Sequence, residues 1–526
     1  MTPRTAQPVH HPGATAERLN TAYLADWVAT QAGLARLPGV QYAVSIDGEL
    51  VLDGAWGVTD LTSGTPLRPD HVFRVASHSK TFTATAVARL VDAGRLRLDD
   101  PLSRHVAELD GSDVGRVTVR EALGHTGGVL RDGHDADYWQ LATPFPDRAT
   151  LLDEVLSHGE VFGRGEHFKY SNLAYGLLGM VIEEITGTRY SEHVRTELIE
   201  PLGLADTSPE LDDDVARRAV VGHSARALAA PGLATMFADG RLPVAAVTTG
   251  ALSAATGFCS TARDLVRWAD AHADGSTLVR PETRRLLQRD ESVIDRPHSP
   301  RRGYGLGFET REVGGRRLVG HSGGFPGQIT RTWFDPSERI AVAVLTNAID
   351  GPADALALGM FGLVTAALEG LEAGSAAEAG AEAEVEAGTG ADGGDPAAPA
   401  TPDGESPDDG ETAAERSPDD GGTAPHPLDR WTGRFANLWG MTDVARLGDR
   451  LWAVDPRRAD PLDGAERLEV DGDVLRPEPH AGFGPVGEPI QVLREADGRP
   501  SAAVVGGMTS WRADDFERQR RAHASR

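Results

Sequence analysis

Phe73-Arg-Val-Ala-Ser77-His-Ser-Lys80-Thr-Phe-Thr-Ala84 places a serine three residues before a lysine at the start of a predicted helix. The apolar residues of this segment recur at helical spacing: Phe82, Ala86, Val87, Leu90 and Val91. Side chains three residues apart on a helix project from the same face. A base that touches a hydroxyl is the minimum that a serine nucleophile requires. We therefore predict that Lys80 contacts Ser77 near the positive end of the helix dipole, where an oxyanion is favoured.

The chain contains only two lysines, Lys80 and Lys169, and every other permanently basic side chain is arginine. Arginine stays protonated at any working pH, whereas a desolvated lysine can lose its proton and act as a base. This difference supports a chemical role for Lys80. Lys169 lies beside a tyrosine, and we expect it to be a solvated neighbour of that residue.

A second motif, Tyr170-Ser171-Asn172, directly precedes a helical pattern that runs from about Leu173 to Ile185 and ends at Gly187. A tyrosine at this place is often a packing residue. A nearby lysine ammonium would instead favour the phenolate form and make Tyr170 able to carry a proton. Both interpretations remain open from the residues alone.

The third motif, Gly320-His-Ser-Gly-Gly324, follows a strand-like run and has two interpretations. One is a strand-borne triplet, His321-Ser322-Gly323, that lines a site. The other is the Gly-x-Ser-x-Gly elbow of an α/β-hydrolase with Ser322 as nucleophile, which requires a following helix and a later acid and histidine. Here a turn and another strand-like run follow, and none of the later histidines is well placed, so the strand-borne triplet is favoured.

Composition places the chain among ordinary globular proteins. With 526 residues, 40% hydrophobic and 25% charged, it should form about two or three domains. A single cysteine, Cys259, excludes an internal disulfide and a cysteine metal cluster, and we expect no metal or other cofactor. The N-terminal residues contain no apolar signal-peptide core and the chain contains no stretch long enough to span a membrane, so we predict a cytoplasmic protein.

The net charge of −27 comes largely from one segment. Residues 369–420 carry sixteen acidic residues and one basic residue, Arg416. The mild acidity of the remainder argues against partners such as nucleic acid or an anionic membrane. Because residues 369–426 contain almost no large apolar side chains, we predict a disordered acidic linker there.

Strand-like runs lie at both ends of the region before this linker, and helices fill its middle. The runs are 41–46, 49–56, 317–319, 328–334 and 340–345. Asp47-Gly48 separates the first two runs and is a hairpin signal. This order predicts an α+β fold, in which an antiparallel sheet is covered by helices.

Short strand-like segments separated by Gly, Asp and Pro follow the linker. They are 443–447, 451–454, 467–470, 474–477, 490–494 and 502–505, and they predict a small all-β barrel over residues 427–515. This part shows no catalytic constellation. Gly482-Phe-Gly-Pro-Val-Gly487 matches a dinucleotide-binding pattern, but its proline and the lack of a following helix indicate a turn.

Residues 16–368 resemble the serine β-lactamase and penicillin-binding-protein superfamily. The likeness is greatest to the class C-like branch, which includes esterases, D-aminopeptidases and D,D-carboxypeptidases. The C-terminal part resembles the lipocalin-like barrels appended to some members. Besides the three motifs, the matching segments are Leu98-Asp-Asp-Pro-Leu102, Val119-Arg-Glu-Ala-Leu-Gly-His-Thr-Gly-Gly128, Glu200-Pro-Leu-Gly-Leu204 and Tyr304-Gly-Leu-Gly-Phe308.

The resemblance implies a set of roles. Ser77 is the nucleophile, and Lys80 either takes its proton or keeps Tyr170 ionised to do so. Tyr170 returns the proton to the leaving group and later activates the water that releases the acyl group. Asn172 hydrogen-bonds the substrate near Lys80.

The third motif would complete the substrate site. His321 and Gly323 are implied to bind substrate, and the backbone N–H groups of Ser77 and Gly324 are implied to form the oxyanion hole. The family usually has a lysine where this chain has His321, and a histidine is largely neutral at pH 7 unless a partner raises its pKa. We therefore expect poor hydrolysis of β-lactams.

These observations predict a serine hydrolase that forms an acyl-enzyme at Ser77 on a small ester or a D-amino-acid-type amide. A non-catalytic binding or scaffold protein with the same fold is the alternative from another class. The oligomeric state stays open.

Overall fold

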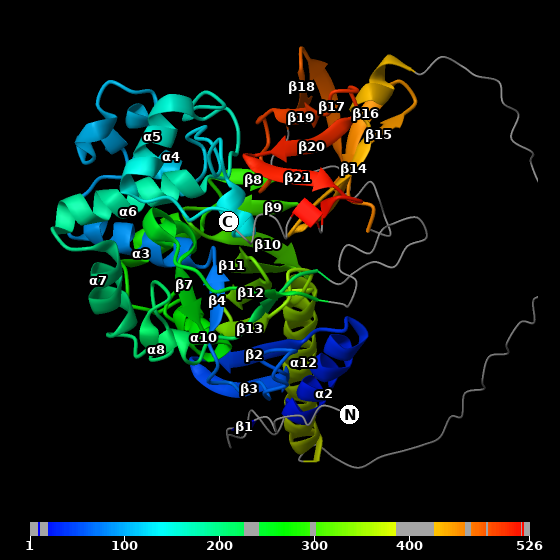
Figure 1. Ribbon diagram of the computed structural model, residues 1–526. Helices are drawn as coiled ribbons and strands as arrows, with labels where there is room; N and C mark the ends of the chain where they lie inside the picture. Colours follow the sequence, from blue (N-terminus) through cyan, green and yellow to red (C-terminus); the bar gives the residue numbers. More distant parts are fainter. Residues whose placement is uncertain are drawn as a thin grey trace, which may run out of the picture.

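The computed structural model describes residues 9–10, 19–225, 241–294, 301–385, 426–457, 464–479, 482–516 and 518–519. These residues form an α+β unit and a closed eight-stranded barrel (Figure 1). The predicted α+β fold with an appended all-β barrel is thereby confirmed. Among the described helices, none combines the length and the apolar character that a membrane span requires.

A nine-stranded antiparallel sheet is the centre of the α+β unit. Its strand order is β1-β3-β2-β13-β12-β11-β10-β9-β8. The strands are β1 (Val9–His10), β2 (Gly39–Ile46), β3 (Glu49–Gly57), β8 (Ser292–Ile294), β9 (Arg302–Tyr304), β10 (Glu309–Val313), β11 (Arg316–Phe325), β12 (Gln328–Asp335) and β13 (Ile340–Thr346). Because β2 pairs with β13, strands from the two ends of the unit belong to one antiparallel sheet, as the sequence predicts.

The turn between β2 and β3 has the predicted hairpin geometry. Asp47 and Gly48 have φ angles of 53° and 82°. Positive φ at both central residues matches the right-handed twist of the flanking strands, which explains the Asp-Gly sequence.

Alternating residues of the sheet pack against different helices. On β2, Val40, Tyr42 and Val44 join a core with α2 (Thr21–Leu34) and α12 (Ala353–Val385), whereas Ala43 faces the opposite core. This period of two follows from the pleat of a strand. Figure 1 shows α2 and α12 together on one side of the sheet and α10 (Ala262–Asp270) with the other helices on the opposite side.

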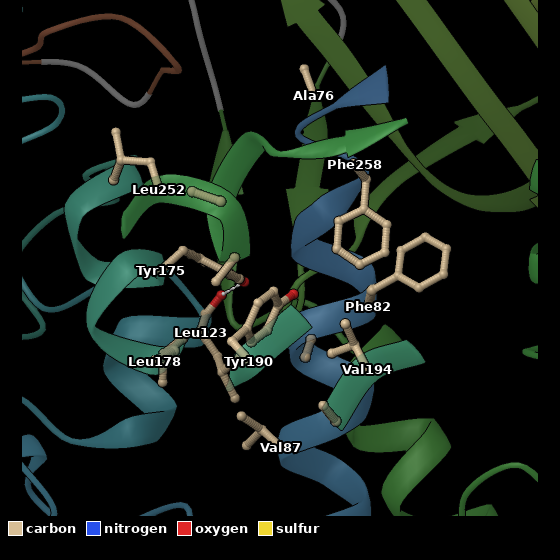
Figure 2. Close-up of a cluster of buried hydrophobic side chains, with 14 of the residues drawn as sticks. Ala76, Phe82, Val87, Leu123, Tyr175, Leu178, Tyr190, Val194, Leu252 and Phe258 are labelled. Atoms are coloured by element: carbon tan, nitrogen blue, oxygen red, sulfur yellow. Dashed lines mark hydrogen bonds between the residues drawn. The ribbon is translucent and has the colours of Figure 1, made fainter. Parts of the chain in front are cut away.

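α3 (Ser79–Asp92) is almost completely buried among the other helices on that opposite side. They are α4 (Val119–Leu123), α5 (Arg148–His158), α6 (Asn172–Thr186), α7 (Tyr190–Val194), α8 (Asp213–Ala216), α9 (Ser253–Thr256) and α11 (Pro281–Gln288). Figure 2 shows Phe82 and Val87 of α3 among side chains from α4, α6 and α7, and Tyr175 donating to the carbonyl oxygen of Leu123 at 2.8 Å. This packing fixes α3 and therefore the residues at its N-terminal end.

The barrel consists of β14 (Gly433–Asn437), β15 (Gly440–Leu447), β16 (Arg450–Val454), β17 (Glu466–Asp471), β18 (Val474–Pro477), β19 (Ile490–Arg494), β20 (Pro500–Val505) and β21 (Met508–Arg512). The sequence patterns locate six of these strands and miss β14 and β21. Pairing between β14 and β21 closes the barrel.

The end of the α+β unit differs from the sequence-based boundary. We expected the acidic linker to begin at residue 369, whereas α12 continues to Val385. The Ala- and Glu-rich composition of this stretch favours a helix, which explains the extension. The rest of the predicted linker, from residue 386 to 425, lies outside the described residues.

Candidate active site

Ser77 lies in the turn between β4 (Phe73–Ala76) and α3. Ala76 has a φ angle of 45°, in the left-handed region that an alanine rarely adopts. This conformation turns the chain sharply out of the strand and leaves the Ser77 side chain partly exposed just before the helix. The helix starts at Ser79, two residues later than predicted, but the position of Ser77 near its positive end agrees with the sequence.

Lys80 lies on the first turn of α3 and is fully buried. Its Nζ atom is 3.1 Å from Ser77 Oγ, 2.7 Å from Asn172 Oδ1 and 2.9 Å from the Ala255 carbonyl oxygen. Burial and the charge of Arg131 lower the pKa of Lys80 well below the ordinary lysine value. Asn172 and Ala255 present oxygens that can only accept, so a neutral amine would donate to both and turn its lone pair towards the Ser77 hydroxyl.

The orientation of the Asn172 amide follows from a second contact. Asn172 Nδ2 donates to Asp132 Oδ1 at 2.6 Å, and Asp132 is itself buried beside the Arg131 guanidinium. A carboxylate only accepts, so it holds the amide nitrogen on its own side and leaves Oδ1 facing Lys80. Asp132 is a positioning residue that the sequence analysis missed, since nothing local distinguishes it from the other acids in its loop.

Asp132→Asn should lower kcat by about 10²-fold, with little change in KM. The new amide can turn its own N–H groups towards Asn172 and rotate that side chain, which would aim a donor at Lys80. Steady-state kinetics on a chromogenic ester measure both constants. Asp135→Asn, in the same loop but exposed, is the matched control and should behave as wild type. An unchanged kcat in Asp132→Asn would contradict this role.

Tyr170 completes the contacts of the serine. Its Oη atom donates to Ser77 Oγ at 2.8 Å, and its ring lies 4.7 Å from Lys80 Nζ. Burial raises the pKa of Tyr170 above the ordinary phenol value. The sequence suggested that a lysine ammonium favours the phenolate, but both groups are buried, which favours a neutral phenol beside a neutral amine. Tyr170 is therefore suited to donate a proton rather than to remove one.

The third motif lies within β11, and its side chains alternate. Ser322 and Gly324 are partly exposed, whereas His321 and Gly323 are buried. Ser322 N–H donates to Glu309 Oε1 at 3.0 Å, across the edge where β10 pairs with β11. Backbone N–H groups two residues apart in a strand point the same way, so the N–H of Gly324 points past the end of β10 into the cleft. This geometry suits the predicted oxyanion contact.

His321 lies behind the wall of the site. It is 1% exposed, its Nδ1 donates to the Ser322 carbonyl oxygen at 2.6 Å, and its Nε2 accepts from Tyr304 Oη at 3.0 Å. Burial lowers the pKa of His321 to about 4, although Glu309 acts in the opposite direction. This side chain is therefore neutral, as expected from the sequence, and its position does not fit the predicted contact with substrate.

Gly323 allows β11 to approach β4. A Cβ atom at this position would lie 2.1 Å from the Val75 carbonyl oxygen, which is far too close. Gly323 therefore serves the packing beneath Ser77. Because it is buried, the predicted substrate contact does not fit its position. Only glycine permits this approach of the two strands.

The elbow alternative for Ser322 is wrong. The chain continues from β11 through a turn into β12, with no helix after the serine. Ser322 Oγ donates to Glu309 Oε1 at 2.7 Å, and that carboxylate is paired with Arg331 at 2.8 Å. A carboxylate held in this ion pair is a poor base, which fits a structural hydroxyl.

Lys169 is not the solvated residue that we expected. Its side chain is fully buried, and Nζ donates to Glu488 Oε1 of the barrel at 2.5 Å and to the Val486 carbonyl oxygen at 2.8 Å. Glu488 Oε1 also accepts from the Arg131 N–H at 3.1 Å. The glycine-rich segment 482–487, interpreted as a simple turn, thus lies against Tyr170, and Phe483 packs edge-on to the Tyr170 ring.

A cavity of about 480 Å³ opens above Ser77. From the α+β unit it is lined by Ser77, Arg131, Asp132, Trp139, Tyr170, Asn172, Ser322 and Gly324, and the rest of its wall comes from the barrel. Four of the seven residues predicted for the site line it, and Lys80 lies directly beneath Ser77. The loop that carries Trp139 thus contributes to the cavity wall.

The arrangement defines a class of protein in which a serine is held between a buried lysine and a tyrosine. The family model for beta-lactamase matches residues 24–367, and the chain belongs to the beta-lactamase family. It is 29% identical over 325 residues to penicillin-binding protein 4 of Amycolatopsis lactamdurans, which covers 59% of this chain and 81% of that protein.

Other relatives match over different lengths. The chain is 27% identical over 327 residues to the D-aminopeptidase of Brucella canis, covering 60% of this chain and 58% of that protein. It spans 38% of the length of protein flp of Staphylococcus aureus, at 26% identity over 36% of this chain.

Two solved structures match the fold. D-amino acid amidase of Ochrobactrum anthropi SV3, in complex with D-phenylalanine, has a TM-score of 0.54 and 26% identity, covering 69% of this chain and 100% of that chain. SurE has a TM-score of 0.54 and 24% identity and covers 94% of this chain and 100% of that chain, so its fold extends over the barrel as well.

Proposed function

We propose that this protein is a serine hydrolase that forms an acyl-enzyme at Ser77 on an ester or a D-amino-acid-type amide. The observation that carries the proposal is the double contact of Ser77 Oγ, with Lys80 Nζ at 3.1 Å and Tyr170 Oη at 2.8 Å. A nucleophile joined to a base, with a third group that orients the base, is the arrangement that covalent catalysis requires.

In the acylation step, Lys80 removes the proton of the Ser77 hydroxyl as Oγ attacks the carbonyl carbon of the substrate. The negative charge on the carbonyl oxygen is bound by the N–H groups of Ser77 and Gly324. Tyr170 gives its proton to the leaving group as the bond to that group breaks. The proton held by Lys80 then replaces the one that Tyr170 lost, which restores both side chains.

In the second half of the cycle, water attacks the acyl carbon and loses its proton to the Lys80–Tyr170 pair. The bond between the acyl carbon and Ser77 Oγ breaks, and that proton returns to Oγ. The pKa of Lys80 is lowered and that of Tyr170 is raised, so one group accepts protons and the other donates them at neutral pH.

The pH dependence should reflect this assignment. Only neutral Lys80 can act as the base, so kcat/KM should fall as the pH drops through the Lys80 pKa, which lies well below the ordinary lysine value of 10.5. We expect an acid limb well below that value and no loss of activity up to about pH 10, because the Tyr170 proton is retained there. A pH–rate profile with an ester checks this. An acid limb centred near the ordinary lysine pKa would contradict the assignment.

Two features support the substrate class. His321 is neutral and buried, so it offers no cation for the carboxylate of a β-lactam. The relatives include a D-aminopeptidase and a D-amino acid amidase, and these names motivate the amide part of the proposal.

The purified protein can be assayed with p-nitrophenyl esters, with D- and L-aminoacyl p-nitroanilides and with nitrocefin. We expect turnover of esters or D-aminoacyl substrates and at least about 10²-fold lower kcat/KM for nitrocefin, the cost of about 2.7 kcal/mol of lost charge recognition. Preferred hydrolysis of nitrocefin would overturn the substrate class. No turnover of any of these would favour the non-catalytic alternative.

A further inference from the structure

The cavity above Ser77 continues into the interior of the barrel. Barrel residues that line it occur in pairs two positions apart on five strands or their ends: Phe435 and Asn437, Thr442 and Val444, Ala453 and Asp455, Ala503 and Val505, Met508 and Ser510. A spacing of two selects one face of a strand, and in a closed barrel that face is the interior. The cavity wall is therefore the inner surface of the barrel rather than its rim alone.

The inner end of this space is closed. Phe435, Val444, Ile490 and Ala503 line the cavity and also belong to the packed core of the barrel. The remainder of that core fills the far end of the barrel: Trp431, Leu451, Leu468, Leu475 and Val492. The space is thus a chamber that faces Ser77, and we refer to it as the barrel chamber.

The wall of the barrel chamber is mainly apolar. Most of its inward-facing side chains are aliphatic or aromatic: Phe435, Val444, Ala453, Ile490, Ala503, Val505 and Met508. Two of its polar side chains have partners within the protein: Asp455 is paired with Arg457, and Asn437 is bound on both sides of its amide. Asn437 Nδ2 donates to Ser510 Oγ at 3.0 Å, and Asn437 Oδ1 accepts from the N–H of Trp439 at 2.8 Å. Such a wall favours an apolar occupant, since burial of a polar group without a partner costs free energy.

Specific contacts hold the opening over the serine. Thr509 N–H and Oγ1 donate to the Asp137 carboxylate at 2.7 and 2.9 Å. Trp439 Nε1 donates to the Trp139 carbonyl oxygen at 3.0 Å, and Lys169 pairs with Glu488 on the other side. Figure 1 shows the barrel seated on the α+β unit next to the strands β8 and β9. Because the barrel is attached on two sides, the chamber and Ser77 face each other in a fixed geometry.

We propose that the barrel chamber binds an apolar alkyl or aryl group of the substrate while Ser77 attacks the adjoining carbonyl carbon. This inference rests on the proposed function and adds a specificity pocket to it. The pocket belongs to the C-terminal domain, so that domain selects the substrate although it supplies no reacting group.

A series of straight-chain alkylboronic acids, from methyl to octyl, tests the proposal on the full-length protein. Serine Oγ adds reversibly to boron, and each compound carries a single organic group. Every added methylene that enters the chamber should tighten inhibition by about fourfold, which corresponds to about 0.8 kcal/mol. The gain should stop when the chain reaches the floor at Phe435.

Ala453→Phe narrows the chamber, because Ala453 lines it and pairs across the sheet with Val444. In this variant we expect methylboronic acid to bind as in wild type and the gain with chain length to disappear. Ala445→Phe is the matched control, since Ala445 is the neighbour of Val444 on the outer face of β15. In this control variant, inhibition should tighten with alkyl chain length as it does in wild type.

The outcomes separate the two proposals. If methylboronic acid does not inhibit the wild-type enzyme at all, the Ser77 site itself fails. If it inhibits but longer chains bind no better, or if Ala453→Phe and wild type show the same series, the chamber is not the binding pocket. If methylboronic acid binds wild type and Ala445→Phe but not Ala453→Phe, the chamber and the serine site are not separable. That result also overturns the proposal.

Discussion

Ser77→Ala should lower kcat/KM for any substrate of this protein by about 10⁴-fold or more. The variant removes the atom that both Lys80 Nζ and Tyr170 Oη contact, so neither the attack nor the proton transfers can proceed. The substitution is small and lies at a partly exposed position in a turn, so the fold should be retained. Ester turnover measures the activity, and circular dichroism shows that the variant is folded.

Ser322→Ala is the matched control for this result. Ser322 also lines the cavity, but its hydroxyl is bound to Glu309 at 2.7 Å and has no role in the proposed chemistry. We expect its kcat/KM to stay within about tenfold of wild type, the effect of one lost hydrogen bond to a charged group. Activity that survives in Ser77→Ala but is lost in Ser322→Ala would reverse the assignment of the nucleophile.

Glu488→Gln should loosen the attachment of the barrel. The variant leaves the buried Lys169 ammonium without its carboxylate, and removal of one partner of a buried ion pair costs about 3–5 kcal/mol. The same carboxylate accepts from the Arg131 N–H beside the site, so kcat should fall as well. Hydrogen–deuterium exchange should be faster by about two to four orders of magnitude in segments 131–140 and 482–488.

The double variant Lys169→Met with Glu488→Gln is the control for that prediction. It removes the buried charge and leaves a side-chain carbonyl to accept from the Arg131 N–H, so slow exchange and most of the activity should return. Exchange in Glu488→Gln at the wild-type rate would show that the pair does not hold the barrel in place.

The fold could be predicted from local patterns to a large extent. The Asp47-Gly48 hairpin, the helix before Gly187 and six barrel strands each depend on turn chemistry or periodicity within a few residues. The missed strands β14 and β21 each begin next to glycines and lack a clear alternation at sequence level. They are strands because β14 and β21 pair with each other and so close the barrel.

The chemistry of the site was predictable for a different reason. Lys80 lies three residues after Ser77, and the turn in which the Lys80 N–H donates to the Ser77 carbonyl oxygen leads directly into α3, so the spacing is enough to predict their contact. Tyr170 and Asn172 came from a second motif and a family resemblance, and the structure brings both to the same place. The pKa of Tyr170 depends on burial from all sides, which no spacing reveals.

The contacts of the barrel with the site could not be predicted from the sequence. Lys169 and Glu488 are separated by 319 residues, and neither has a local signal that it is buried. The rarity of lysine was in fact informative for both lysines, since each is fully buried and makes specific hydrogen bonds. His321 was correctly expected to be neutral, but its position behind the wall depends on Tyr304 and Glu309 from other strands.

Mass spectrometry of the acyl-enzyme tests the account most directly. The wild-type protein is mixed with a p-nitrophenyl ester, quenched with acid during turnover and digested. We expect the mass of the acyl group on the peptide that contains Ser77, a stronger signal in a variant with slow deacylation, and none in Ser77→Ala. An acyl group on the peptide that contains Ser322, or turnover without any acylated serine, would contradict the account.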